Sequence, residues 1–273
     1  MNIPNYKLKE NEKYRICKIE DKLTTEFFTP HQHNYFEMIF FTNTSTYNAK
    51  HSIDFKSYSI EKNRIFFVAK EQAHEWLDKE LLEDYKGYFI VFNESFVQSY
   101  KVLLELFDFL NHEPFIDLSE SEEHVPLRLI ELIEEQHDMK SQCYQQSLID
   151  ALLHFLVEKK KSSLRPMDIN QERFVKLRNL IAEHYKEEKQ VLFYAKKMDL
   201  SVKRLDVIAK LVSPLSVTEL IHKQILLQAK RELSLGLKTV TSIASELGYH
   251  DPSYFSKFFK KHEGISPSEF MSK

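Results

Sequence analysis

The chain has 273 residues and a formal net charge of −3, with 42% hydrophobic and 29% charged residues. This length suits about two domains, and the composition is that of a folded globular protein rather than a disordered one. The chain has only 4 glycines, far below the usual ~7%, and this scarcity argues against the clustered glycines of nucleotide-binding loops.

Targeting signals are not apparent in the sequence. No run approaches the ~18 consecutive apolar residues of a membrane span, and the first residues, Met1 to Lys7, have no apolar segment like that of a signal peptide. The cysteines Cys17 and Cys143 form no motif, so we interpret both as reduced thiols. These features predict a cytoplasmic protein with no membrane partner.

Charge divides the chain into two parts. Residues 1–164 carry 19 Lys and Arg against 28 Asp and Glu, a net charge of −9, whereas residues 165–273 carry a net charge of +6. The boundary follows a basic and polar run, residues 159–163. Such an asymmetry is typical of a protein with one nucleic-acid-binding part. We therefore predict two domains, 1–164 and 165–273.

The first ~100 residues are predicted to form β-structure. Short aromatic and apolar runs occupy residues 35–41, 53–60, 65–68 and 87–92, and their length favours buried strands over helices. Strands without intervening helices indicate an antiparallel sandwich or barrel. Apolar residues at helical spacing then predict helices at about 125–138 and 142–160, so the fold class is α+β.

The C-terminal part is predicted to be all α-helical. Thr239 and Asp251 are good N-cap residues, Pro252 suits a first helical position, and Gly236 and Gly264 suit helix ends. The predicted helices cover about 171–186, 191–198, 202–211, 217–235, 240–247 and 252–263.

Residues 240–263 have the pattern of a helix-turn-helix unit. A short helix ends near Gly248, which can adopt the left-handed turn conformation, and a second helix begins behind Asp251 and Pro252. Phe255, Phe258 and Phe259 then face the core, while Ser253, Ser256, Lys257 and Lys260 lie on the other side, as a helix entering the major groove requires.

An earlier segment, about 191–211, repeats this pattern. Ala195 corresponds to Ala244, Asp199 stands at the glycine position, and Leu205 corresponds to Phe255. The intervening helix of 19 residues would span ~28 Å. Such a spacer can place two recognition helices about one DNA turn, ~34 Å, apart.

These residues resemble the DNA-binding domain of the AraC family of bacterial transcription regulators. The resemblance covers residues 172–270 and is most specific in Ile243-Ala244, Leu247-Gly248-Tyr249, the run from Asp251 to Lys261, and Gly264-Ile265-Ser266-Pro267. It implies a transcription regulator rather than an enzyme, more often an activator. The partners implied are promoter DNA, RNA polymerase, a small-molecule effector and a second copy of the chain, with no cofactor.

The resemblance also indicates the residues that contact DNA. Asp206 and Val207 depart from the polar or basic residues common in the family, and Ala209 replaces a large aromatic, so the first unit is expected to bind weakly or to act as a scaffold. The expected DNA contacts are Lys203, Arg204, Ser253, Ser256, Lys257, Lys260 and Lys261.

Histidines in the N-terminal part form a second motif. His31, His33 and Glu37 have the spacing HxHxxxE, and His74 follows later. This resembles the cupin-like sensor domains of AraC-family regulators, and in cupin enzymes such residues bind a divalent metal. Because the flanking glycines of the cupin pattern are absent, with residues 62–64 where one is expected, we interpret these four residues as a ligand pocket without metal.

Two alternative functions remain open from the sequence. One is a metal-dependent cupin enzyme that uses His31, His33, Glu37 and His74. The other is an interaction module with a degenerate helix-turn-helix. In the favoured interpretation, the helices after the barrel pair two subunits, and the apolar stripe expected at the dimer interface includes Leu148, Leu152 and Phe155.

Overall fold

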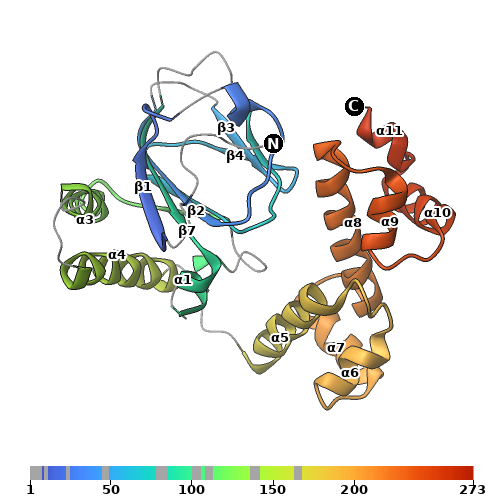
Figure 1. The fold of residues 1–273 in the computed structure, drawn as a ribbon. Coiled ribbons are helices and arrows are strands. Elements are labelled where there is room, and N and C mark those ends of the chain that lie inside the picture. Colours follow the sequence, from blue (N-terminus) through green and yellow to red (C-terminus); the bar gives the residue numbers. More distant parts are fainter. Residues whose placement is uncertain are drawn as a thin grey trace. The chain divides into compact units, whose positions relative to one another are not determined.

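The computed structural model of the chain divides into two compact units, Met1–Arg165 and Pro166–Lys273 (Figure 1). The predicted boundary at residue 164 lies outside the described residues. The structure describes residue 8 and residues 12–22, 25–44, 49–77, 85–99, 106–107, 113–135, 142–162 and 168–272.

The N-terminal unit contains two antiparallel sheets and several helices, which confirms the predicted α+β class. Hydrogen bonding separates the described strands into two sheets rather than one closed barrel. The five-stranded sheet has the order β1 (Tyr14–Lys18), β7 (Tyr85–Phe92), β2 (Phe36–Thr44), β5 (Arg64–Val68) and β8 (Phe115–Asp117). The three-stranded sheet has the order β4 (Lys56–Ser59), β3 (Lys50–Ile53) and β6 (His74–Trp76).

The five-stranded sheet is buried on both faces. Successive side chains of a strand point to opposite faces, so Ile39 and Phe41 pack in one cluster with Trp76 of the smaller sheet. Met38 and Phe40 pack in another cluster, with helical residues. This two-sided burial explains why the strands appear in the sequence as continuous apolar runs.

Helices cover the outer face of the five-stranded sheet. Ile130 and Ile133 belong to the same buried cluster as the sheet residues, and α3 and α4 run side by side next to the strands in Figure 1. The helical elements of this unit are η1 (Thr25–Phe28), α1 (Glu94–Ser99), α3 (His124–Glu135) and α4 (Gln142–Ser162).

One predicted strand is wrong in detail. Residues 53–60 do not form a single strand, because Asp54 and Phe55 adopt positive φ angles of 49° and 66°. Two such residues in succession form the tight turn of a β-hairpin, and this turn joins β3 to β4. The short strands β1, β6 and β8 were not predicted, because three to five residues carry too little periodicity.

The C-terminal unit consists of helices, as predicted. The helices predicted at residues 217–235 and 252–263 have the same bounds in the structure, and the other predicted helices differ by one or two residues at one or both ends. The helices are α5 (Ile169–His184), α6 (Val191–Lys197), α7 (Val202–Val212), α8 (Val217–Leu235), α9 (Val240–Glu246), α10 (Pro252–Glu263) and α11 (Pro267–Met271).

Local capping sets these helix ends. The side chains of Thr239 and Asp251 accept backbone N–H groups at the starts of α9 and α10, as an N-cap does. Gly236 and Gly264 end α8 and α10 in the left-handed conformation. Helix α11 was missed, although its capping box from Ser266 to Glu269 is visible in the sequence. Among the described residues, no helix is both long and apolar enough to cross a bilayer.

Candidate functional site

The two helix-turn-helix units have the same turn geometry. In the first, the Leu200 N–H donates to the Ala195 carbonyl at 2.9 Å, and in the second the Tyr249 N–H donates to the Ala244 carbonyl at 2.9 Å. Asp199 and Gly248 occupy equivalent positions, with φ angles of 55° and 74°. Asp tolerates this conformation better than most residues, which explains why it replaces glycine in the first turn.

The interiors of the two units also correspond. Ala195 and Ala244 are buried where the helices of each unit cross, and Leu205 and Phe255 are fully buried on the second helix of each. All four belong to one apolar cluster that extends through the C-terminal unit. The internal repeat seen in the sequence is therefore a structural repeat.

Helix α10 presents a polar and basic face to solvent. Ser253, Lys257, Lys260 and Lys261 are exposed, as the sequence predicted for a recognition helix, while Phe255 and Phe259 are buried.

Two residues of α10 differ from expectation. Ser256 is half-buried, and its hydroxyl donates to the Pro252 carbonyl at 2.9 Å, so it is less available to a base than predicted. Tyr254 is 72% exposed beside the expected contacts. The sequence motif did not single it out, because the phenylalanines around it were assigned to the core.

Helix α7 presents a different surface. Lys203 and Arg204 are exposed near its start, but Val207 and Leu211 are exposed further along, Leu211 to 64%. Val207 corresponds to Lys257 when Leu205 is aligned with Phe255. The first unit thus places an apolar side chain where the second unit has a lysine.

Asp206 has a structural partner that explains its presence. Its Oδ1 accepts the backbone N–H of Val217 at 3.1 Å, so it satisfies one of the free donors at the start of α8. The residue is half-buried. This contact makes Asp206 part of the joint between α7 and α8 rather than a base contact.

Two lysines, Lys189 and Lys238, connect segments of the C-terminal unit that are separate in sequence. The Lys189 ammonium donates to the carbonyls of Lys186 and Gly248 at 2.7 and 3.3 Å, and burial lowers the pKa of Lys189. Lys238 pairs with Glu232 and Glu246 at 3.0 and 2.6 Å, and its hydrogen bond to Glu246 raises its pKa. The turn of the second unit is thereby held against the segment that precedes the first.

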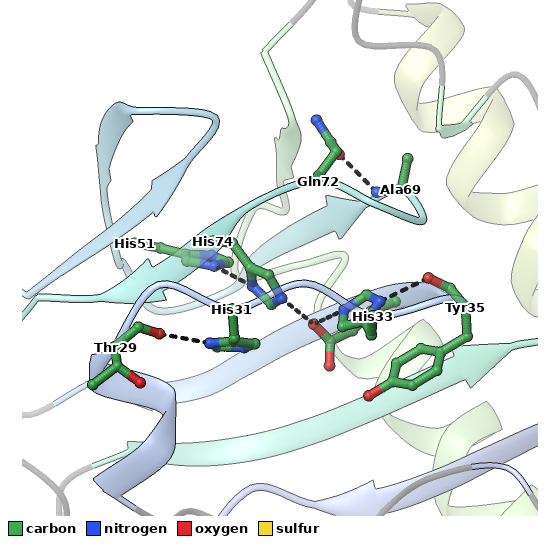
Figure 2. Close-up of polar contacts among 9 residues, drawn as sticks. Thr29, His31, His33, Tyr35, His51, Ala69, Gln72 and His74 are labelled. Carbon is green, nitrogen blue, oxygen red and sulfur yellow. Dashed lines mark hydrogen bonds and ion pairs between the residues drawn. The ribbon is translucent and has the colours of Figure 1, made fainter. Parts of the chain in front are cut away.

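The N-terminal unit gathers the histidines of the predicted motif. Figure 2 shows the imidazoles of His31, His33 and His74 close together, joined by a further histidine, His51. Ligand atoms of His33, Glu37 and His74 all lie within 4.8 Å of one another, and all three side chains are buried. The Oε2 atom of Glu37 is 3.4 Å from His33 Nε2 and 3.9 Å from His74 Nε2.

Each imidazole is oriented by a hydrogen bond through one of its ring nitrogens. The Nδ1 atoms of His31 and His33 donate to the carbonyls of Thr29 and Tyr35, both at 2.8 Å. A hydrogen bond of 3.1 Å joins His51 Nε2 and His74 Nδ1. His51 was missed by the sequence analysis because it reaches the cluster through the pairing of β3 with β6, where Ile53 stands opposite His74.

Burial favours the neutral form of His31, His51 and His74. Desolvation, followed by the neighbouring histidines, lowers the pKa of His51 to about 3 and that of His74 well below its usual value. Burial also lowers the pKa of His31. Neutral imidazoles and a carboxylate are ligands that a divalent transition metal accepts, so the chemistry of the cluster permits a metal.

One position at which the cupin pattern has a glycine is occupied by an asparagine with a similar backbone conformation. Asn63 lies in the segment where one glycine was expected, and it adopts a φ angle of 65°. Asn is enriched in this left-handed region, so it performs the conformational role that glycine would have. At this one position the backbone adopts the left-handed conformation without a glycine.

The predicted dimer residues have unequal environments. Leu152 is fully buried in the core of its own unit, which leaves it unavailable to a partner. Leu148 and Phe155 are partly buried at the edge of the same cluster. Tyr144, on the same face of α4, is exposed.

Residues 194–273 match the family model of a helix-turn-helix domain. No curated protein matches the chain. Among solved structures, ToxT from Vibrio cholerae O395 is 13% identical, with a TM-score of 0.47 and coverage of 95% of this chain and 96% of that one. The AraC-like transcriptional activator CuxR is 13% identical, with a TM-score of 0.33 and coverage of 80% and 73%.

These two likenesses are too remote to support a statement about function. The family match begins in α6 and runs through α11, so it includes both recognition helices. Together with the repeated turn and the motif of residues 243–267, it shows that residues 194–273 form a helix-turn-helix domain of the AraC type, the DNA-binding domain of transcription regulators.

Proposed function

We propose that the chain regulates transcription by placing α10 in the major groove of promoter DNA, with α7 in a second, weaker contact. The observation that carries this proposal is the exposed face of α10, on which Ser253, Lys257, Lys260 and Lys261 project from a helix anchored by buried phenylalanines. The net charge of +6 over residues 165–273 supports it.

The two units would contribute unequally. Lys203 and Arg204 can reach phosphates near the start of α7, but Val207 and Leu211 offer only apolar contact, as with a thymine methyl group. We therefore assign most of the sequence readout to α10. The first unit would add affinity and fix the register.

The N-terminal unit is proposed to control this binding. A small-molecule effector bound near His31, His33, Glu37 and His74, or a second copy of the chain at α4, would alter the arrangement of the DNA-binding units. The favoured outcome is activation of transcription through recruitment of RNA polymerase. The protein would act in the cytoplasm.

Catalysis is not part of this proposal. The metal-dependent enzyme inferred as an alternative from the sequence would use His31, His33, Glu37 and His74, the same buried residues to which we assign the effector. The degenerate helix-turn-helix alternative is disfavoured, because both units retain their turn and core.

Replacing Lys257 with alanine tests the assignment of α10. If its ammonium contacts a phosphate, Lys257→Ala should weaken binding by ~10-fold at all sequences and reduce the salt slope by ~1. The operator comes from selection in a random DNA library, and affinity is measured by fluorescence anisotropy at several salt concentrations. Val207→Ala, at the equivalent position of α7, is the matched control and should change affinity less than ~2-fold.

Three results would contradict these proposals. Equal affinity of Lys257→Ala and the wild type, with an unchanged salt slope, would remove α10 from the DNA interface. A larger loss for Val207→Ala than for Lys257→Ala would reverse the proposed roles of the units. Failure of the wild-type chain to select any sequence at low salt would overturn the function itself.

The dimer is tested separately at α4. Leu148→Glu places a charge at the partly exposed edge of the helix and should lower the dimer fraction in sedimentation velocity, because an unpaired charge is costly at an apolar interface. Its thermal melt should stay close to that of the wild type, since Leu148 is only partly buried. A wild-type protein that is already monomeric at micromolar concentration would refute the interface.

A further inference from the structure

Two aliphatic side chains lie on the solvent-facing side of α7. Val207 is 41% exposed and Leu211 is 64% exposed, and residues four apart share one face of a helix, with ~6 Å between their Cβ atoms. The opposite side of α7 is anchored by Leu205, Ile208 and Ala209, which are inaccessible to solvent. The unit therefore folds around α7 without Val207 and Leu211, and packing does not explain why the outer face carries them.

The structural repeat places these two residues where the second unit has lysines. In the alignment that pairs the buried core residues of the two units, Val207 corresponds to Lys257 and Leu211 to Lys261. Both units close their turn with an equivalent backbone hydrogen bond of 2.9 Å, so the outer faces of α7 and α10 have the same orientation within their units. Because Lys257 and Lys261 are assigned to DNA, the aliphatic pair of α7 faces DNA as well.

Basic side chains surround the aliphatic pair. Lys203, Arg204 and Lys210 are exposed on α7, and side chains of this kind contact DNA phosphates without reading sequence. Asp206 does not oppose this charge at the outer face, because its carboxylate accepts the backbone N–H of Val217 at 3.1 Å. The composition of the surface therefore suits a polyanion that also presents apolar groups, which is the character of the major groove.

Thymine is the base that an aliphatic pair recognises. Every base edge in the major groove presents hydrogen-bonding atoms, but only thymine adds an apolar group, its C5-methyl. An aliphatic side chain against guanine or cytosine would instead cover polar atoms and leave their hydrogen bonds unmade, which is unfavourable. Contact with thymine removes two apolar surfaces from water.

We propose that Val207 and Leu211 read thymine methyl groups in the DNA segment next to the one that α10 occupies. The ~6 Å between the two side chains is close to the rise of two base pairs, ~6.8 Å, so the pair covers thymines up to two base pairs apart. This assignment rests on the proposed function. It gives the first unit a base preference that its phosphate contacts do not supply.

Uracil substitution tests this assignment one methyl group at a time. In the operator selected from a random DNA library, each thymine is replaced in turn by deoxyuridine, which pairs with adenine as thymine does and lacks only the methyl group. The affinity of the full chain, measured by fluorescence anisotropy, should fall ~2–4-fold at one or two positions. This is the order expected when one carbon group is no longer withdrawn from water.

Matched variants connect the lost methyl group to α7. Val207→Ser and Leu211→Ser should each bind the thymine and deoxyuridine operators with equal affinity at the position that the residue reads. Serine is used because alanine also contacts thymine methyl groups. The control is Val212→Ser, at an exposed valine of the same helix that lies ~100° around the axis from Leu211. This variant should keep the wild-type preference for thymine.

A reciprocal exchange changes the preferred base rather than removing it. Val207→Lys gives α7 the side chain that α10 carries at Lys257, and a lysine ammonium donates to the O6 and N7 atoms of guanine. Selection with this variant should replace one thymine of the operator by guanine and leave the bases read by α10 unchanged. The wild-type chain, selected in parallel, provides the reference.

Three results would overturn the thymine assignment. Equal wild-type affinity for the thymine operator and every deoxyuridine operator would show that no methyl group is read, while loss of binding in Lys257→Ala would still support the proposed function. Unchanged discrimination in Val207→Ser and Leu211→Ser would assign the methyl contact to other residues. If these two variants instead bind DNA like the wild type and lower the dimer fraction in sedimentation, the pair is a protein contact.

Discussion

Gly248→Ala is expected to destabilise the C-terminal unit by about 3 kcal/mol. Gly248 has a φ angle of 74°, where any other L-residue is strained by ~1–2 kcal/mol. A Cβ at this position would also lie 2.0 Å from the Lys186 carbonyl oxygen and 2.7 Å from Lys189 Nζ. Because the nearer atom is backbone, the turn must move to accept the methyl group.

Gly236→Ala is the matched control for this prediction. Gly236 has a similar φ angle of 62°, but no atom lies within 4 Å of its added Cβ. Gly236→Ala should lose only ~1–2 kcal/mol of stability, because it adds the strain of the left-handed conformation without a close contact. Urea unfolding followed by circular dichroism at 222 nm reports mainly on the helices, and equal losses in the two variants would show that the close approach of Lys186 is unimportant.

Arg64→Ala is expected to destabilise the N-terminal unit by about 2–3 kcal/mol, the order of a charged hydrogen-bond network lost from a buried position. The Arg64 guanidinium donates to both carboxylate oxygens of Asp117, at 2.6 and 2.9 Å, and to the Ser59 carbonyl at 2.7 Å. It also stacks on the ring of Phe115 at 3.9 Å. These contacts connect β5 and β8 of one sheet with β4 of the other.

Hydration of Asp117 in the Arg64→Ala variant limits the loss of stability. The side chain of Arg64 is only 8% exposed, but that of Asp117 is 56% exposed and can be hydrated when its partner is removed. The control is Arg128→Ala, because Arg128 pairs with Glu131 on the surface of α3 and such pairs contribute at most ~1 kcal/mol. The single tryptophan, Trp76, lies in this unit, so its fluorescence follows the unfolding. Equal stability of the two variants would contradict the bridging role of Arg64.

The C-terminal helices could be predicted because their signals are local. Thr239, Asp251 and Gly236 cap helix ends within three or four residues of their own position, so they determine structure without knowledge of the rest of the fold. The repeated motif also predicted structure across a long sequence separation, since the alignment of Ala195 with Ala244 indicated two equivalent helix-turn-helix units. Asp206 escaped this reasoning because its partner, Val217, lies on the following helix.

The N-terminal unit was harder to predict because its strands pair across long sequence separations. The apolar run 53–60 did not reveal that Asp54 and Phe55 form a turn, since neither is glycine. The histidine motif located His31, His33 and Glu37, which lie close in sequence. His51 could not be found in this way, because only the pairing of β3 with β6 brings it to His74.

The contact of Lys189 with Gly248 has a consequence for cooperativity. It crosses from the segment before the first helix-turn-helix to the turn of the second, and one apolar cluster includes residues of both. Regions that share their core and their polar contacts open together in local unfolding. We therefore expect the two helix-turn-helix units to unfold as one cooperative unit, so that a DNA site that engages α10 alone also protects the backbone amides of α7 from exchange with solvent.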